Sequence, residues 1–160
     1  MRGGVADALA AAVSSHKQPP TLLAGTSTAG IPWATLVADR LALPLAYVRP
    51  EAKQHGMGRR VEGVPVSGHR VILIEDLIST GGSSIKCVEA LKAEGAEVLE
   101  TLAIFSYGLA KAGRTFADAG VPLRPLSTLT ALMSKAVRMG MLTKTAAGFI
   151  KDWMRVGRSD

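Results

Sequence analysis

Short apolar runs alternate along the chain with longer segments in which apolar residues recur every three or four positions. Runs of about four apolar residues, bounded by glycine, proline or polar residues, are typical of buried strands. The longer periodic segments are typical of amphipathic helices. We therefore expect strands at residues 21–24, 45–48, 71–74 and 97–105, a short extended segment at 121–126, and helices at 5–15, 31–41, 83–93, 128–139 and 143–155.

The alternation of strands and helices predicts an α/β fold, with a central, mostly parallel β-sheet flanked by helices. Residues 71–74 are apolar at every position, as expected for a strand that is covered on both faces. Residues 49–63 are polar, contain several glycines and lack periodicity, so we expect a loop there. No repeat or linker divides the sequence, and we expect a single domain over residues 1–160.

The composition restricts the kind of partner. Hydrophobic residues make up 48% of the chain, which is typical of a globular protein. The net charge of +6 favours an anionic partner but does not separate nucleic acids from phosphorylated metabolites. Aromatic residues are only 4%, which argues against stacking platforms for single-stranded nucleic acid. No zinc-finger spacing or HExxH motif is present, and the composition leaves the kind of anionic partner open.

The single cysteine, Cys87, cannot form an internal disulfide, which fits a reducing cytoplasm. It lies in the helix expected at residues 83–93, where we expect a small buried residue. No apolar run is long enough to span a bilayer. The alanine-rich start could be mistaken for a signal peptide, but Asp7 interrupts its apolar segment. We therefore expect a cytoplasmic protein outside the membrane.

The most informative stretch is HRVILIEDLISTGGSS, residues 69–84. Its two carboxylates, Glu75 and Asp76, follow directly after the expected strand. Open parallel sheets bind ligands beyond the carboxyl ends of their strands. Carboxylates at such a place accept hydrogen bonds from sugar hydroxyls. The acidic pair therefore predicts a site for a sugar.

The glycine-rich turn behind the acidic pair predicts a phosphate site. Gly81 and Gly82 are expected to permit close backbone approach and positive φ angles. Backbone N–H groups at the following helix start form an anion site, and the turn also carries hydroxyl donors. A strand-turn-helix with ordinary capping residues and a solvated acidic pair is the alternative. Carboxylates and hydroxyls together on one short stretch favour a sugar phosphate.

Two further segments suit an anionic ligand. Residues 24–32, AGTSTAGIP, form a second glycine-bounded turn between a strand and a helix, although an ordinary turn remains an equal alternative. Residues 47–63, YVRPEAKQHGMGRRVEG, gather several cations, which repel one another unless an anion joins them. Glycines in this segment would allow it to move, while a solvated basic loop is the alternative. Its basic residues are Arg49, Lys53, His55, Arg59 and Arg60.

Together these segments resemble the type I phosphoribosyltransferase family, and among its members the orotate phosphoribosyltransferases. The resemblance rests on EDLISTGGSS, GTSTAGIP, YVR, K-x-HG and the late segment LSTLTALMSKAVRMGML, and it runs from about Val5 to the C-terminal helices. It implies transfer of the 5-phosphoribosyl group from phosphoribosyl diphosphate (PRPP) to orotate, giving orotidine 5′-monophosphate and diphosphate in pyrimidine nucleotide biosynthesis. It also implies that the partners are small-molecule substrates and not nucleic acid or a membrane, and that Mg²⁺ is held mainly by the substrate. It further implies a homodimer whose catalytic loop reaches the neighbouring active site.

The resemblance assigns roles to individual residues. It implies that the acidic pair holds the ribose hydroxyls, that residues 79–83 hold the 5-phosphate, and that the turn after the first strand contacts the diphosphate. The catalytic residues that the resemblance implies are Arg49, Lys53, His55 and Asp76. Its PRPP-binding residues are Thr26, Ser27, Arg49, Lys53, His55, Glu75, Asp76, Leu77, Ile78, Ser79, Thr80, Gly81, Gly82 and Ser83. Its orotate-binding residues are Ser79 and Tyr107.

The sequence departs from the family around the base. Pro50 stands where many members have a second cation, and Tyr107 stands where some have an arginine for the carboxylate of orotate. The family also has an N-terminal arm that supplies a lysine to the base, and this sequence begins too late to contain it. A truncated start, a missing arm and a different base contact are all open. A PRPP-binding regulator or inactive paralogue, and a transferase for another base, remain alternatives.

Overall fold

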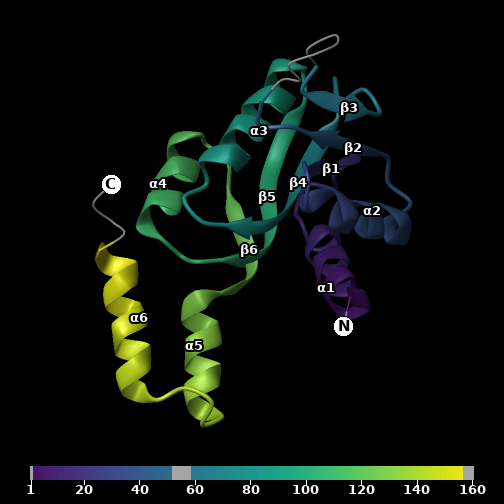
Figure 1. The fold of residues 1–160 in the computed structure, drawn as a ribbon. Coiled ribbons are helices and arrows are strands. Elements are labelled where there is room, and N and C mark those ends of the chain that lie inside the picture. Colours follow the sequence, from purple (N-terminus) through teal and green to yellow (C-terminus); the bar gives the residue numbers. More distant parts are fainter. Residues whose placement is uncertain (1, 52–58, 157–160) are drawn as a thin grey trace.

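The computed structural model describes residues 2–51 and 59–156, which fold around a central sheet (Figure 1). Six strands follow the order β3-β2-β1-β4-β5-β6, and all neighbours are parallel except β2 and β3. The predicted mostly parallel α/β sheet is confirmed. The strands are β1 (Leu22–Thr26), β2 (Leu45–Val48), β3 (Val61–Gly63), β4 (Arg70–Ile78), β5 (Glu97–Ser106) and β6 (Leu123–Thr128).

Helices cover both faces of the sheet (Figure 1). α1 (Arg2–Ser14) and α2 (Gly30–Leu41) pack on one face, where Leu9 and Val37 meet Ile72 of β4. α3 (Gly82–Ala93) and α4 (Ala110–Asp118) pack on the other face, where Phe116 joins Leu73. Central strands are therefore buried on both sides, as their continuous apolar runs predict. None of the helices in the described ranges is both long and apolar enough to cross a membrane.

Two elements were not predicted, and several strand ends were placed wrongly. β1 ends at Thr26 and not at residue 24, and β6 spans Leu123–Thr128 where an extended segment was predicted at residues 121–126. β3 has three residues, too few to show an alternating pattern, so the loop predicted through residue 63 ends earlier. α4 has only two buried residues, Ala112 and Phe116, and its polar composition hid it. β4 continues beyond Ile74 to Ile78, because it pairs with β5 over this length. Glu75 and Asp76 therefore lie within the strand, near its carboxyl end.

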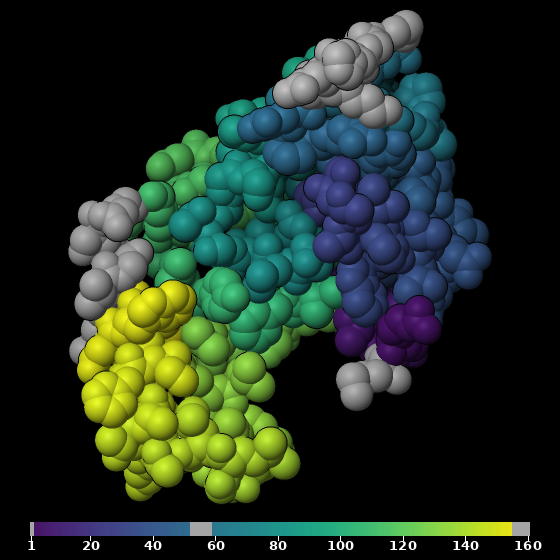
Figure 2. All heavy atoms as spheres, viewed as in Figure 1, coloured from purple at the N-terminus to yellow at the C-terminus, as the bar shows by residue number. Residues whose placement is uncertain are grey.

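The C-terminal helices form a hairpin that extends away from the sheet (Figures 1 and 2). α5 (Leu129–Arg138) begins after β6, where Thr128 accepts a hydrogen bond from the N–H of Ala131 at 3.2 Å. α6 (Lys144–Val156) meets the body through an edge-on ring contact between Tyr107 and Trp153. Both helices agree with the sequence prediction to within about one residue at each end.

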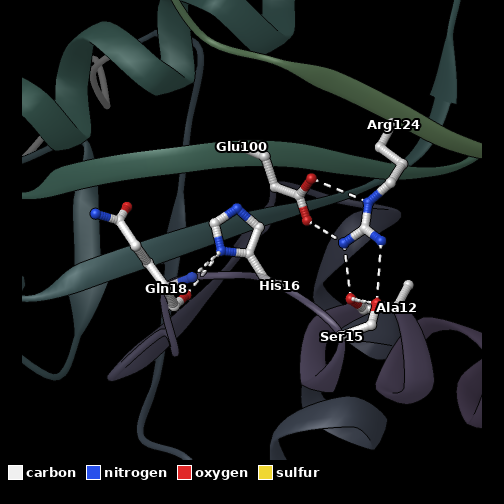
Figure 3. Close-up of polar contacts among 6 residues, drawn as sticks. All are labelled: Ala12, Ser15, His16, Gln18, Glu100 and Arg124. Carbon is white, nitrogen blue, oxygen red and sulfur yellow. Dashed lines mark hydrogen bonds and ion pairs between the residues drawn. The ribbon is translucent and has the colours of Figure 1, made fainter.

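An ion pair between a buried glutamate and a partly exposed arginine ties α1 to the sheet (Figure 3). Glu100 on β5 is buried, and its Oε2 accepts a hydrogen bond from Nε of Arg124 on β6 at 3.0 Å, while Oε1 is bound by Nη2. Nη2 also donates to the carbonyl oxygen of Ala12 at 2.7 Å. This carbonyl belongs to the last turn of α1, which has no basic residue of its own. Arg124 therefore supplies a cation to the negative end of that helix.

Replacing Arg124 with Met should lower the free energy of unfolding by about 3 kcal/mol, because the Glu100 carboxylate would stay buried without its partner. Urea unfolding would measure this loss. A matched control is Arg40→Met, because Arg40 on α2 pairs with the exposed Asp7 at 2.7 Å. Exposed pairs contribute about 0–1 kcal/mol, so this variant should lose far less. Equal losses in the two variants would contradict the assignment of Arg124.

Candidate active site

A pocket of about 280 Å³ lies at the carboxyl ends of β1 and β4. It brings together the turn after β1, the beginning of the basic segment, the acidic pair and the start of α3, as the order of the parallel strands requires. Segments about 50 residues apart in sequence thus share one site. Its lining residues are Thr26, Ser27, Thr28, Ala29, Pro50, Glu75, Asp76, Leu77, Ser83 and Cys87.

Glu75 is the most buried carboxylate of the pocket, with an exposed fraction of 7%. Its Oε1 accepts hydrogen bonds from the hydroxyl of Thr26 at 2.5 Å and from the N–H of Asp76 at 3.2 Å. Its Oε2 accepts a hydrogen bond from the hydroxyl of Ser84 at 2.7 Å. Burial raises the pKa of Glu75 above its ordinary value, and the two hydroxyl donors partly oppose this shift.

The raised pKa of Glu75 makes stability depend on pH. A buried acid contributes its full stability below the unfolded pKa of 4.5 and loses it as the pH rises through the higher folded pKa. Glu75→Gln should therefore gain in Tm relative to the native protein as the pH rises above 4.5. Scanning calorimetry across this range would measure the difference. A difference that stays flat or shrinks would contradict a raised pKa.

Asp76 lines the same pocket but is only half-buried, so its carboxylate can meet a ligand. Within residues 2–51 and 59–156, no group of three or more histidine, cysteine or acidic residues could hold a metal ion. A Mg²⁺ ion commonly needs one or two carboxylates when a substrate supplies phosphate oxygens. Asp76 therefore fits a Mg²⁺ ion whose remaining ligands come from a phosphorylated substrate.

The predicted phosphate turn projects from the end of β4. Ser79, Thr80 and Ser83 are exposed, and their hydroxyls are accessible to an anion. Gly81 has a φ of +85°, and a Cβ there would lie 2.8 Å from the ring of Phe116. The prediction for Gly81 is thus confirmed. The positive φ predicted for Gly82 was wrong. A Cβ at Gly82 would meet open space.

The two apolar residues between the acidic pair and this turn differ. Leu77 is 41% exposed and lines the pocket. The Ile78 side chain is buried in the core, and its carbonyl oxygen accepts a hydrogen bond from the N–H of Tyr107 at 3.0 Å. The buried side chain of Ile78 therefore anchors the start of the glycine-rich turn, residues 79–82, to the core.

The turn after β1 is packed closely against the acidic strand. A Cβ at Gly30 would lie 2.3 Å from the hydroxyl of Thr26 and 2.6 Å from the carbonyl oxygen of Ile74. The N–H of Ser27 donates to the carbonyl oxygen of Val48 at 2.8 Å, and the Ser27–Thr28 peptide bond is cis. Ser27 is half-buried and lines the pocket together with Thr26.

The basic segment is described only at its two ends. Lys53 and His55 lie outside the described residues. Nε of Arg49 lies 3.3 Å from Oε1 of Glu62, whose Oε2 accepts a hydrogen bond from Tyr47 at 2.5 Å. The guanidinium of Arg49 also lies 5.6 Å from the centre of the Tyr47 ring. Arg49 is therefore held at the base of the segment by an acid and an aromatic ring.

Arg60 has a positional role that the sequence did not reveal. Its guanidinium donates to the carbonyl oxygens of Arg49 at 3.1 Å and Pro50 at 2.8 Å, and also to that of Lys86 on α3. It thus joins both ends of the basic segment to a helix that borders the pocket. Arg59, its neighbour, is exposed.

The predicted base residues, Ser79 and Tyr107, are not among the residues that line the pocket. The backbone of Tyr107 is joined to Ile78, directly before Ser79. Its ring lies edge-on to Phe105 at 6.0 Å and to Trp153 at 6.3 Å between centroids. The structure thus places the two residues directly after the carboxyl ends of the neighbouring strands β4 and β5, but not among the residues that line the pocket of the acidic pair.

Cys87 lies at the wall of the pocket and is buried, as predicted. Burial raises the pKa of its thiol to about 12, so it stays protonated at neutral pH. Cys87 is therefore an unreactive packing residue.

Comparisons with known proteins show which sequences and folds this chain resembles. The profile of the phosphoribosyl transferase domain matches residues 3–123. The orotate phosphoribosyltransferase of Bacillus caldolyticus is 46% identical over 149 residues, which cover 93% of this chain and 72% of the relative. That of Lactococcus lactis is 44% identical over 153 residues, covering 96% and 73%.

Solved structures show the same fold. The orotate phosphoribosyltransferase of Aeropyrum pernix superposes with a TM-score of 0.74 at 36% identity, covering 83% of this chain and 74% of that one. The UMP synthase of Leishmania donovani gives a TM-score of 0.79 at 22% identity, covering 96% of this chain and 32% of that one. The second similarity concerns the fold alone.

Proposed function

Because this chain belongs to the orotate phosphoribosyltransferase family, we propose that it transfers the 5-phosphoribosyl group of PRPP to orotate, yielding orotidine 5′-monophosphate and diphosphate. One observation carries this proposal. Asp76 lines one pocket together with hydroxyl-bearing residues of two turns, one after β1 and one at the start of α3. This arrangement fits a ribose that carries phosphate groups at both ends.

In this proposal, hydrogen-bond donors of the protein face both phosphate-bearing ends of PRPP. The exposed hydroxyls and N–H groups of residues 79–83 bind the 5-phosphate, helped by the positive end of α3. The turn that contains Thr26 and Ser27 binds the diphosphate. Asp76 accepts hydrogen bonds from the ribose hydroxyls. Asp76 would hold a Mg²⁺ ion whose other ligands are mainly substrate oxygens, and that ion would neutralise charge on the diphosphate.

The reaction breaks the bond between C1 and the diphosphate oxygen, and the diphosphate leaves with the electron pair of that bond. A bond forms between C1 and N1 of orotate, and the proton of N1 is released to the diphosphate or to solvent. Positive charge develops on the ribose, and negative charge develops on the leaving diphosphate. Asp76 stabilises the positive charge. Arg49, Lys53 and His55 stabilise the negative charge, with Arg49 held in place by Glu62.

The absorbance of orotate tests the reaction directly. Mixing the protein with PRPP, Mg²⁺ and orotate should change this absorbance as the nucleotide forms. Consumption of PRPP with a different base, and none with orotate, would identify a transferase for that base. PRPP binding without turnover on any base would identify a regulator. The position of Tyr107, outside the pocket and where some relatives have an arginine, is the reason to test other bases.

We also propose a homodimer with shared active sites, located in the cytoplasm. The family loop around Lys53 supports the dimer, and the single buried thiol is compatible with a reducing compartment. Mixing inactive Lys53→Ala with inactive Asp76→Asn should restore part of the activity, because a hybrid dimer regains one intact site. Labelled subunits would show that exchange has occurred. Exchange without recovered activity would contradict shared sites.

A further inference from the structure

Three segments that build the pocket meet at one buried carboxylate. Thr26 ends β1, Glu75 lies on β4 and Ser84 lies in the first turn of α3. Both hydroxyls donate to Glu75, at 2.5 Å and 2.7 Å, and all three residues are buried. We propose that Thr26 and Ser84 are positioning residues that act through Glu75 to hold the two phosphate-binding turns at a fixed separation. This inference rests on the proposed PRPP site.

The packing around Thr26 supports this role. The Thr26 hydroxyl also lies 3.4 Å from the carbonyl oxygen of Ile74, a long contact compared with the one to Glu75. Gly30, which begins α2, leaves just enough space for this hydroxyl, since a Cβ would approach it to 2.3 Å. The turn that precedes α2 therefore packs directly on the Thr26 hydroxyl that donates to Glu75.

The same reasoning applies to Ser84. Ser84 follows Ser83, which lines the pocket. The hydrogen bond from Ser84 to Glu75 therefore fixes the start of α3 relative to the carboxylate. A buried carboxylate is costly unless its oxygens are hydrogen-bonded, and removal of one donor shifts the others. Among the described contacts, no hydrogen bond joins Thr26 to Ser84. Energetic coupling between these two residues must therefore pass through Glu75.

A double-mutant cycle on PRPP affinity tests the coupling. Thr26→Val and Ser84→Ala should each weaken PRPP binding about ten-fold in calorimetry with Mg²⁺, since each lets the carboxylate move. The PRPP affinity of the double variant should also fall about ten-fold, not about a hundred-fold. The first substitution already lets the Glu75 carboxylate move, so the second has little left to remove. Thr26→Ser and Ser84→Thr, which keep the hydroxyl, should stay within about two-fold of the native affinity.

The matched control is Thr35→Val, which removes a hydroxyl that donates to the carbonyl oxygen of Ile31 on the exposed face of α2. It should leave PRPP affinity unchanged. Additive losses, or a lowered Tm with native affinity, would overturn the proposal. If Thr26→Val does not fold, Ser84→Ala should lose its effect in a Glu75→Gln background, and an undiminished effect there would overturn it. These tests require PRPP binding alone, so failure of orotate turnover remains a separate result.

Discussion

Lys53→Ala should lower kcat by roughly two to three orders of magnitude, the range found when one preorganised donor is removed from a reacting charge. The resemblance to the family predicts that Lys53 belongs to a catalytic loop. We expect its side chain to meet the diphosphate only as the bond to C1 breaks. Interactions made only in the transition state lower kcat and kcat/KM together. The KM for PRPP should therefore change little in steady-state kinetics.

Arg59→Ala is the matched control for this variant, because Arg59 belongs to the same basic segment and is exposed. Its removal should act through long-range attraction and fade as the salt concentration rises. A Lys53→Ala enzyme with native kcat and a raised KM would show that the segment only collects substrate. The catalytic assignment of Lys53 would then be wrong.

Asp76→Asn should weaken PRPP binding by roughly one to two orders of magnitude. Loss of a hydrogen bond to a charged group costs roughly 1.5–3 kcal/mol, which corresponds to this change in affinity. Asp76 is half-buried in the pocket, so the substitution removes the charge without opening a cavity in the core. Calorimetric titration with PRPP and Mg²⁺ would measure the effect.

Glu89→Gln provides the comparison, since Glu89 is an exposed carboxylate on α3. It changes the net charge by the same amount but is not among the residues lining the pocket. Equal PRPP affinity in the Asp76 and Glu89 variants would show that the protein charge, and not a contact with ribose, is responsible for binding.

Local features were determined by the sequence alone. The apolar run at residues 45–48 coincides with β2, and the periodic segment at residues 31–41 matches α2 to within one residue. The turn predicted to bind phosphate was also identifiable as a turn, because Gly81 needs a positive φ that few other residues adopt. Hydrophobic periodicity and turn chemistry depend on neighbours within a few positions, so they can be recognised without the fold.

The tertiary structure alone decided which distant groups meet. Thr26 is 49 residues from Glu75, and Arg124 is 112 residues from the Ala12 carbonyl that it binds. The order of the strands creates both contacts, and no local pattern encodes it. The same order left Tyr107 outside the pocket and made Arg60 a link to α3. Burial also separates the adjacent carboxylates, since Glu75 is enclosed by internal donors while Asp76 stays accessible to a ligand.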